Sequence, residues 1–314
     1  MQFRVLMIIL NWLITGLIRS KQILSNPALR KLEKMLDNLL FLSAPITVSV
    51  LLAGILSYFG NHILSRGIIF IDIAVAQIAA LGTMIGLLLG FAEESLNVQL
   101  ISYIFTVIII ALFALTKSRK QVIPQEAIIG IIYCVGLGLA MLLAEKIPGG
   151  SNFITKTITG NLLWVTWDKV LYCFIMFLII GIIHLIFRKQ FIMITDTRNG
   201  LPYTLWRTRT YELLFYITFS VAIVKAVPVG GVFLVFTLLI APTAAATLFT
   251  QNWKKRFIWS WIIGVLGSVL GMYISYTLDI SNAPSIVTLL GVTVFFLAFG
   301  KLAAQKFKTI SIKK

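Results

Sequence analysis

"GIIFIDIAVAQIAALG" runs from Gly67 to Gly82 and is almost wholly apolar, yet it contains Asp72 and Gln77. In hydrocarbon, only helices and closed barrels satisfy every backbone hydrogen bond. The apolar residues are continuous rather than alternating, which favours a helix over a barrel strand. Burying a carboxylate in such a helix costs free energy, and such residues usually have a functional role or a charged partner. Asp72 is therefore a candidate functional residue.

The composition extends this interpretation to the whole chain. Of its 314 residues, 59 % are hydrophobic and only 12 % are charged, whereas soluble domains contain about 25 % charged residues. We therefore expect an all-α, polytopic bundle of about nine membrane-spanning helices, each about 20 residues long. The expected spans are 41–59, 68–91, 98–116, 127–145, 170–187, 211–227, 231–249, 257–277 and 284–300.

The net charge of +16 does not indicate a nucleic-acid-binding protein, because the basic residues lie in loops between the apolar runs. Loops rich in Lys and Arg mark the cytoplasmic side of a membrane protein. Alternate loops follow this rule, which predicts a multi-pass protein with a basic cytoplasmic tail over 301–314. The basic loop residues are Arg66, Lys117, Arg119, Lys120, Arg188, Lys189, Arg198, Arg207, Arg209, Lys254, Lys255 and Arg256.

The first 40 residues fit the span pattern less well than residues 41–300, which we expect to form the transmembrane domain. The apolar run over 5–18 is short for a span, and the segment over 26–40 alternates apolar and charged positions. Such a pattern is typical of a helix that lies in the membrane interface. We expect residues 1–40 to be interfacial or weakly inserted.

Asp72 lies on a face of small residues. At helical spacing this face continues through Ala76, Ala79, Thr83 and Gly86, so it either approaches another backbone or lines a cavity. Two interpretations of Asp72 follow. In the functional one, its carboxylate coordinates a cation or gates a path. In the structural one, it caps its own helix or pairs with Arg66. Gln77 is offset from Asp72 by about 140° around the helix, so the two side chains need not meet.

Two further residues are weaker candidates for cation binding. His62 precedes the 68–91 span, although a lone histidine is more often structural. Glu126 opens the 127–145 span, where an acidic residue also complements the helix dipole. The chain has one other histidine, His184, at the end of a span, and two cysteines, Cys134 and Cys173, which we expect to be packing residues without a disulfide.

Two segments interrupt the spans. The connection over 146–169 contains Gly149, Gly150, Trp164 and Trp167 and is typical of a short interfacial or re-entrant helix. The basic segment over 188–212 is the longest polar stretch inside the bundle and is a natural docking surface for a cytoplasmic partner. The sequence contains no GxxxxGK[ST] motif, so if transport is driven by ATP, another chain binds the nucleotide.

Five stretches together carry a resemblance to a known family. They are "HILSRGIIFIDIAVAQIAALG" (62–82), "EAIIGIIYCVGLGLAM" (126–141), "ITGNLLWVTWDKV" (158–170), "VGGVFLVFTLLIAPTAAA" (229–246) and "DISNAPSIVTLLG" (279–291). In this order they resemble the membrane subunit of the ABC-type importers for zinc, manganese and iron. The resemblance covers about residues 41–300.

This sequence departs from the family at one place. The usual second helix reads Gly-Asp-x-x-x-His, with Asp and His one turn apart. Here Gln77 stands at the histidine position and Ile73 at the aspartate position, while Asp72 lies one residue earlier. An amide is a poorer zinc ligand than an imidazole. We interpret this as an alternative design within the family.

The resemblance implies a homodimeric permease of the bacterial inner membrane that works by alternating access. A cytoplasmic P-loop ATPase would dock near 188–212, and an extracytoplasmic metal-binding protein would deliver the cargo. No cofactor would be bound permanently, and the transported ion would be a divalent metal, zinc first and manganese or iron next. The candidate path residues are Asp72, His62, Gln77 and Glu126.

Other kinds of protein remain as alternatives. A self-sufficient secondary transporter would place polar clusters at mid-membrane in inverted repeats, and the Asp72 pattern has no second copy here. A membrane-embedded enzyme would need converging His, Asp or Glu residues, and the chain has only two histidines. An ABC permease for a non-metal substrate is the alternative that shares most features with the leading hypothesis.

Overall fold

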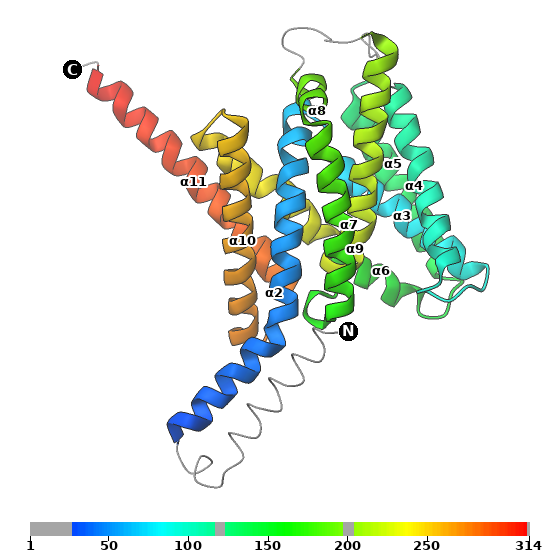
Figure 1. Cartoon of the computed structure of the whole chain (residues 1–314), viewed down its shortest axis with the longest axis horizontal. Helices are drawn as coiled ribbons and strands as arrows, with labels where there is room; N and C mark the ends of the chain where they lie inside the picture. The colour runs from blue at the N-terminus through cyan, green and yellow to red at the C-terminus, as the bar shows by residue number, and fades with distance from the viewer. Residues whose placement is uncertain (1–26, 117–122, 197–203, 313–314) are drawn as a thin grey trace. The chain divides into compact units, whose positions relative to one another are not determined.

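Every regular element that the structure describes is a helix, as the continuous apolar runs predict (Figure 1). The computed structural model describes residues 27–116, 123–196 and 204–312. The elements are α2 (Pro27–Arg66), α3 (Ile71–Leu88), α4 (Leu96–Thr116), α5 (Gln125–Ala144), α6 (Gly150–Thr159), η1 (Leu162–Trp164), α7 (Trp167–Ile186), α8 (Arg188–Thr195), α9 (Leu205–Phe249), α10 (Trp253–Leu278) and α11 (Asn282–Ile312).

The chain divides into two compact units, Met1–Pro45 and Ile46–Lys314. In the first unit, the apolar run predicted over 5–18 lies outside the described residues. Residues 27–40 are helical and continue without a break into the membrane-spanning part of α2. Their location in the membrane interface stays a prediction.

Eight of the described helices are long and apolar enough to cross a membrane, and each of the nine predicted spans overlaps one of them. The difference in number arises in α9, which contains both 211–227 and 231–249. The connection between these two predicted spans needs no loop residues. It is a single break in the helix at Gly231, where φ is 77° and ψ is 159°.

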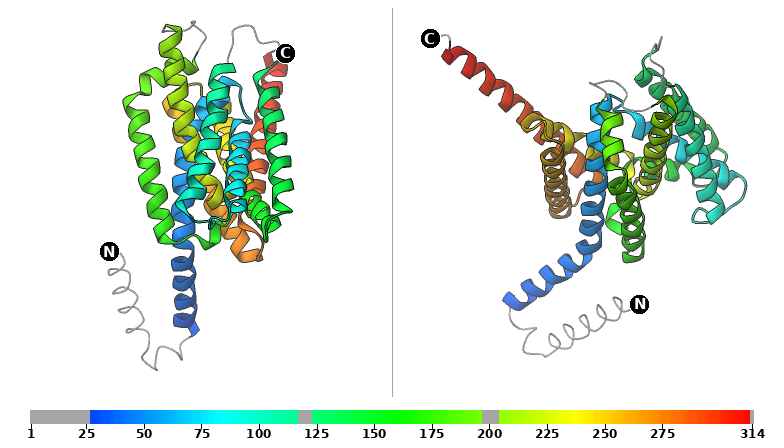
Figure 2. Two further views of the ribbon diagram at one scale, coloured as in Figure 1. Left: turned by 90° about the vertical axis from the view of Figure 1, so that its right-hand side faces the viewer. Right: turned by 45° about the horizontal axis from the view of Figure 1, so that its top comes forward.

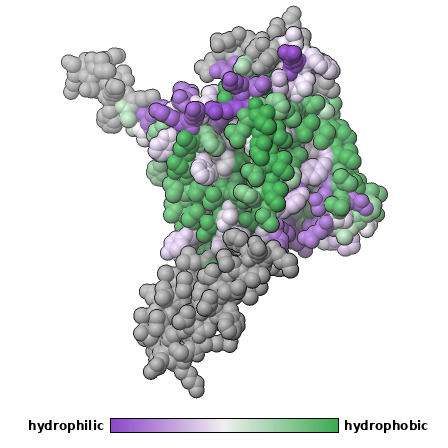
Figure 3. Space-filling view, viewed as in Figure 1, coloured by the Kyte–Doolittle hydropathy of each residue, from purple (hydrophilic) through white to green (hydrophobic). Residues whose placement is uncertain are grey.

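The surface of the second unit agrees with a membrane location. In Figure 3 its visible face carries a broad band of apolar side chains between hydrophilic side chains at the upper and lower margins. The helices α4, α5, α7 and α11 contribute most of their side chains to the apolar surface. Only 11 % to 28 % of the residues in the apolar stretch of each helix are buried. An exposed apolar surface of this size suits hydrocarbon rather than water.

Helix α3 is the most enclosed of the spans, because 72 % of its residues are buried inside the bundle. It packs against α4, α5 and α9. Its small-residue face meets α4 at close range, because a Cβ atom on Gly82 would overlap the backbone of Ser102. The Ser102 hydroxyl donates to the Ala79 carbonyl at 2.9 Å. From Ala79 to Gly86, the structure therefore shows the close approach to another backbone, one of the two alternatives for this face.

The connection over 146–169 contains a short helix, as predicted, and the glycine after it packs against α9. Gly160 has φ 73° and ψ 179°, a region that essentially only glycine adopts, and the backbone of Gly231 lies in the same region. The Asn161 N–H donates to the Val229 carbonyl at 3.1 Å across this contact. A Cβ atom on Gly160 would overlap the backbone of Gly230 and Gly231.

We refer to one end of the second unit as the basic end. There α2 and α7 end and α10 begins, with Arg66, Arg188 and Lys254 among the residues present, at the top of Figure 1. Figure 1 labels α8 at this same end, and Figure 2 shows the helices of the bundle from two further directions. Both described cysteines are free thiols, with Cys173 buried and Cys134 exposed on α5.

The glycine contact between the α6–η1 connection and α9 leads to a prediction. Gly160→Ala should prevent the chain from reaching its folded state, because the added methyl group has no room and the backbone conformation is strained. Gly149→Ala is the matched control. Gly149 also has a positive φ, but a Cβ atom there would meet open space, so the loss should be about 1–2 kcal/mol.

The measurement is the yield of monodisperse protein in detergent and its thermal unfolding midpoint. Similar yields and midpoints for the two variants would contradict the close backbone contact.

Candidate functional site

Asp72 lies in the first turn of α3 and is 1 % exposed. Its Oδ1 atom has no hydrogen-bond partner among the described residues. A buried carboxylate oxygen without a donor costs free energy, unless the site serves a cation or a proton. The position at a helix start stabilises the negative charge in part through the helix dipole.

Arg66, the predicted alternative partner of Asp72, is engaged elsewhere. Its Nε atom donates to the Thr195 hydroxyl at 3.2 Å, and its guanidinium carbon lies 4.0 Å from the centre of the Phe215 ring. In the described part of the chain, no ion pair joins Arg66 to Asp72. The structure therefore does not show the pairing of Asp72 with Arg66, while helix capping and a role in an ion path both remain open interpretations of Asp72.

Glu126 joins the start of α5 to the start of α3. Its Oε1 atom accepts a hydrogen bond of 2.7 Å from the backbone N–H of Ile69. Asp72 follows Ile69 by about one helical turn. Both carboxylates thus belong to the starts of two helices that pack against each other, at the basic end of the bundle.

Gln77 belongs to α3, is 4 % exposed and lies at the contact of α3 with α5. A Cβ atom on Gly136 of α5 would be 3.5 Å from the Cβ atom of Gln77. Gly136 of α5 therefore lies close to Gln77 at this helix contact. Gln77 and Asp72 lie on the same helix, and both are buried inside the bundle.

His62 has a different environment from the carboxylates. It is 1 % exposed on α2, and its Nδ1 atom shares a hydrogen bond of 2.9 Å with the Thr195 hydroxyl of α8. Its ring packs on Tyr58, Phe215 and Trp253 at centroid distances of 5.0 to 5.4 Å. These contacts are typical of a structural histidine.

The second histidine belongs to the same group of rings. His184 shares hydrogen bonds with the Tyr58 hydroxyl at 3.0 Å and the Thr218 hydroxyl at 2.7 Å, and it stacks on Phe191 at 4.3 Å. We call this group the aromatic cluster; it consists of Tyr58, Phe59, His62, His184, Phe191, Phe215 and Phe219. Within the described residues, no three His, Cys, Asp or Glu side chains gather closely enough to hold a metal ion.

The aromatic cluster and Thr195 hold α8 against the bundle. Thr195, at the end of α8, is 4 % exposed and contacts both His62 and Arg66 of α2, while Phe191 is fully buried. The sequence pattern did not single out Thr195 and Phe191 as residues that position α8. The available signal was the spacing of Phe191, Ile194 and Thr195, which places them on one face of a short helix that begins with three polar residues.

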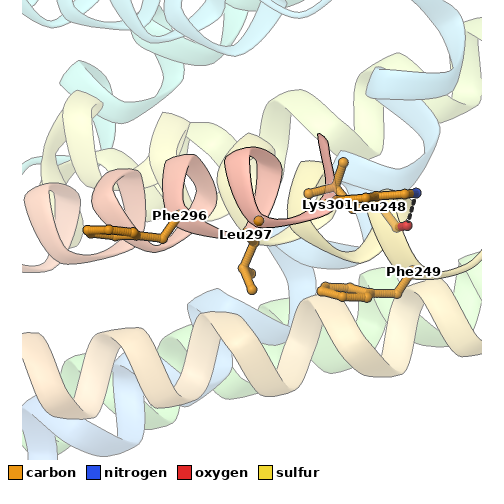
Figure 4. A pocket seen from close by; sticks show the side chains of 6 residues that line it. Leu248, Phe249, Phe296, Leu297 and Lys301 are labelled. Atoms are coloured by element: carbon orange, nitrogen blue, oxygen red, sulfur yellow. Dashed lines mark hydrogen bonds between the residues drawn. The ribbon is translucent and has the colours of Figure 1, made fainter. Parts of the chain in front are cut away.

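A cavity of about 570 Å³ lies between the end of α9 and α11 (Figure 4). Leu248, Phe249, Phe296, Leu297, Gly300 and Lys301 line it, and the Lys301 ammonium donates to the Leu248 carbonyl. Since this cavity has no acidic side chain in its lining, it offers a cation no carboxylate ligand.

The comparison with protein families decides the kind of protein to which this arrangement belongs. Residues 38–301 match the model of the ABC 3 transport family. The chain belongs to the ABC 3 transport family. The family inferred from the five sequence stretches is thereby confirmed. The chain is a membrane permease subunit of an ABC transporter, and not its ATPase, which argues against the self-sufficient secondary transporter.

Curated relatives match most of the chain. The chain is similar to a probable iron transport system membrane protein of Haemophilus influenzae, with 26 % identity over 84 % of this chain and 93 % of the relative. It is also similar to the manganese transport system membrane protein MntC of Halalkalibacterium halodurans, with 25 % identity over 82 % of this chain and 86 % of the relative.

A solved structure shares the fold. The chain in question belongs to PsaBC from Streptococcus pneumoniae in complex with Fab, and it superposes with a TM-score of 0.69 at 21 % identity. The match covers 85 % of this chain and 95 % of that chain. The likeness confirms the all-α architecture expected from the sequence.

The contacts of Thr195 lead to a prediction about α8. Thr195→Val keeps the shape of the side chain but leaves the Arg66 Nε and the His62 Nδ1 atoms without their partner, at a cost of about 1–3 kcal/mol. The thermal unfolding midpoint in detergent should fall. Thr210→Val is the control, because Thr210 is exposed and its hydroxyl donates only to the Trp206 carbonyl of its own helix.

Equal midpoints for the Thr195→Val and Thr210→Val proteins would show that these hydrogen bonds do not hold α8 in place.

Proposed function

We propose that this permease carries a divalent transition metal ion into the cell and that Asp72 lines the path of the ion. The observation that carries the proposal is the buried Asp72 carboxylate, whose Oδ1 atom has no hydrogen-bond partner among the described residues. Intramembrane carboxylates of this kind mark ion pathways. The names of the two curated relatives, an iron and a manganese transport protein, support the same cargo class.

The donor atoms near the path favour manganese, with iron next and zinc after both. Asp72, Gln77 and Glu126 offer oxygen ligands, which suit Mn²⁺, whereas zinc is typically held by imidazole and thiolate. His62, the imidazole candidate, is engaged with Thr195 and the aromatic cluster. The family resemblance placed zinc before manganese and iron. In this proposal zinc comes last.

The small number of ligands suits a path rather than a storage site. A permeating ion must bind well enough to enter and weakly enough to leave. Asp72 with one or two further oxygen ligands would meet that condition, because a complete set of strong ligands would hold the ion. In this proposal the metal is cargo, and the chain has no permanently bound cofactor.

The basic end supplies the contact with the ATPase. Basic loops mark the cytoplasmic side, so α8 and the first turns of α9 would face the cytoplasm together with the C-terminal tail. A P-loop ATPase would dock there, and an extracytoplasmic binding protein would deliver the ion at the opposite end. Two copies of the permease would form the path by alternating access.

The geometry offers a route from the ATPase to the path residue. Thr195 of α8 contacts Arg66, the last residue of α2. Only four residues, which include Gly67 at φ 68°, separate Arg66 from the start of α3. A displacement of α8 would therefore move the start of α3, where Asp72 lies.

The test is metal uptake by cells that lack their own manganese, iron and zinc importers and express this chain with its ATPase and binding protein. Asp72→Asn removes the charge and keeps the size of the side chain, so uptake should fall roughly tenfold or more. Asp279→Asn is the matched control, because Asp279 is an exposed turn residue at φ 52°, a conformation that Asn also accepts.

Both proteins must be present at equal levels in the membrane. Normal manganese uptake by the Asp72→Asn protein would remove Asp72 from the path, and accumulation of none of the three metals by the unaltered chain would favour a non-metal substrate.

A further inference from the structure

A second cavity, of about 590 Å³, lies within the unit of residues 46–314 and has no part in the proposed ion path. One wall is the face of α2 from Leu51 to His62, and the other walls come from α7, α8 and the start of α10. The volume falls in the range of small-molecule sites, which is about 300–1,000 Å³.

The cavity is a groove that opens on the membrane-facing surface. Helices α7 and α10 are not among the helix pairs that pack closely together. The lining residues Phe174, Leu178, Leu185 and Ile258 are also 46 % to 71 % exposed, so they face outward as well as into the groove. In a membrane protein, such a surface meets hydrocarbon chains.

The depth of the groove comes in part from Gly181 of α7. A Cβ atom on Gly181 would meet no heavy atom within 4 Å. The space beside this glycine is therefore open rather than filled by protein, in the half of α7 that is nearer the basic end.

Charge is concentrated at one end of the groove. Arg188 of α8 and Lys254 of α10 line the cavity there, and both side chains are exposed. Among the described residues, neither is part of an ion pair. Trp253, an aromatic residue of the kind that lies at the headgroup level, is next to Lys254 in the same lining.

The length of the groove matches one leaflet of a bilayer. Leu51 and His62 are separated by about 16 Å along α2, and half of the hydrocarbon core is about 15 Å thick. The lining is mostly apolar along this length and carries Arg188 and Lys254 at one end. This arrangement matches the two parts of a phospholipid, an acyl chain and a charged headgroup, which an apolar helix of another protein does not combine.

We propose that this groove binds one anionic phospholipid from the leaflet at the basic end. An acyl chain lies along α2 between α7 and α10, and the phosphate lies between Arg188 and Lys254. Two cations without an acidic partner favour an anionic headgroup over a zwitterionic one. Because Arg188 belongs to α8, the bound lipid contacts the helix that, under the proposed function, meets the ATPase.

The experiment measures lipid retained by the full chain purified together with its ATPase subunit. The complex is equilibrated in nanodiscs that contain phosphatidylglycerol and an excess of phosphatidylethanolamine, and it is then released into detergent for native mass spectrometry. We expect one phosphatidylglycerol molecule per permease chain. The readout is lipid binding, so it does not depend on whether the cargo is a metal.

Two pairs of variants test the two ends of the groove. Arg188→Gln with Lys254→Gln should weaken phosphatidylglycerol retention about thirtyfold, whereas Lys189→Gln with Lys255→Gln, the adjacent basic residues outside the lining, should not. Gly181→Leu should exclude the lipid by filling the groove. Gly291→Leu on α11 is its control, since a Cβ atom on Gly291 also meets open space.

Equal retention of phosphatidylethanolamine, or equal weakening by the two charge variants, would overturn the proposal. So would the absence of retained lipid from the unaltered chain, a result that would assign the groove to a second copy or to the chain's own segment over 5–18.

Discussion

The close packing of α3 against α4, α5 and α9 is the constraint on which the rest of the bundle depends. In a membrane, helices gain little from burying apolar area against one another, since lipid tails are equally apolar, so packing at short range between small residues provides the stability. Gly82 brings α3 to the backbone of α4, and Gly136 brings α5 to Gln77. The consequence is a central helix whose polar residues are shielded from lipid.

The burial of Asp72 follows from that packing. A carboxylate on a lipid-facing helix would be expelled toward the interface, whereas one on the central helix is held inside. The start of α3 is positioned from two sides, by the hydrogen bond from Ile69 to Glu126 and by the short connection from Arg66. The candidate path residue thus lies where α2, α3 and α5 meet at the basic end.

The basic end concentrates the proposed functions of the chain. The aromatic cluster anchors α8, Thr195 joins α8 to α2, and Arg188 and Lys254 mark the end of the groove between α7 and α10. Buried aromatic rings and hydroxyl contacts join α8 in this region to α2, α7 and α9. A change in the position of α8 would therefore reach both the start of α3 and the lipid groove.

The sequence by itself determined the fold class, the spans and the family, because a bilayer requires apolar runs of fixed length and because the five stretches occur in a specific order. It also singled out Asp72, since a carboxylate in an apolar run is visible without a structure. It also separated 211–227 from 231–249, and the structure places the break between them at Gly231. It did not show that this connection needs no loop, because a single glycine at a positive φ is enough to redirect the chain.

Only the tertiary structure separated the candidate residues from one another. His62 and Asp72 are ten residues apart in the sequence, yet His62 belongs to the aromatic cluster and Asp72 to the start of α3, because a turn intervenes and the two helices bury different faces. Thr195 and the groove between α7 and α10 were likewise decided by the fold, since each depends on contacts with α2, which is more than a hundred residues away in the chain.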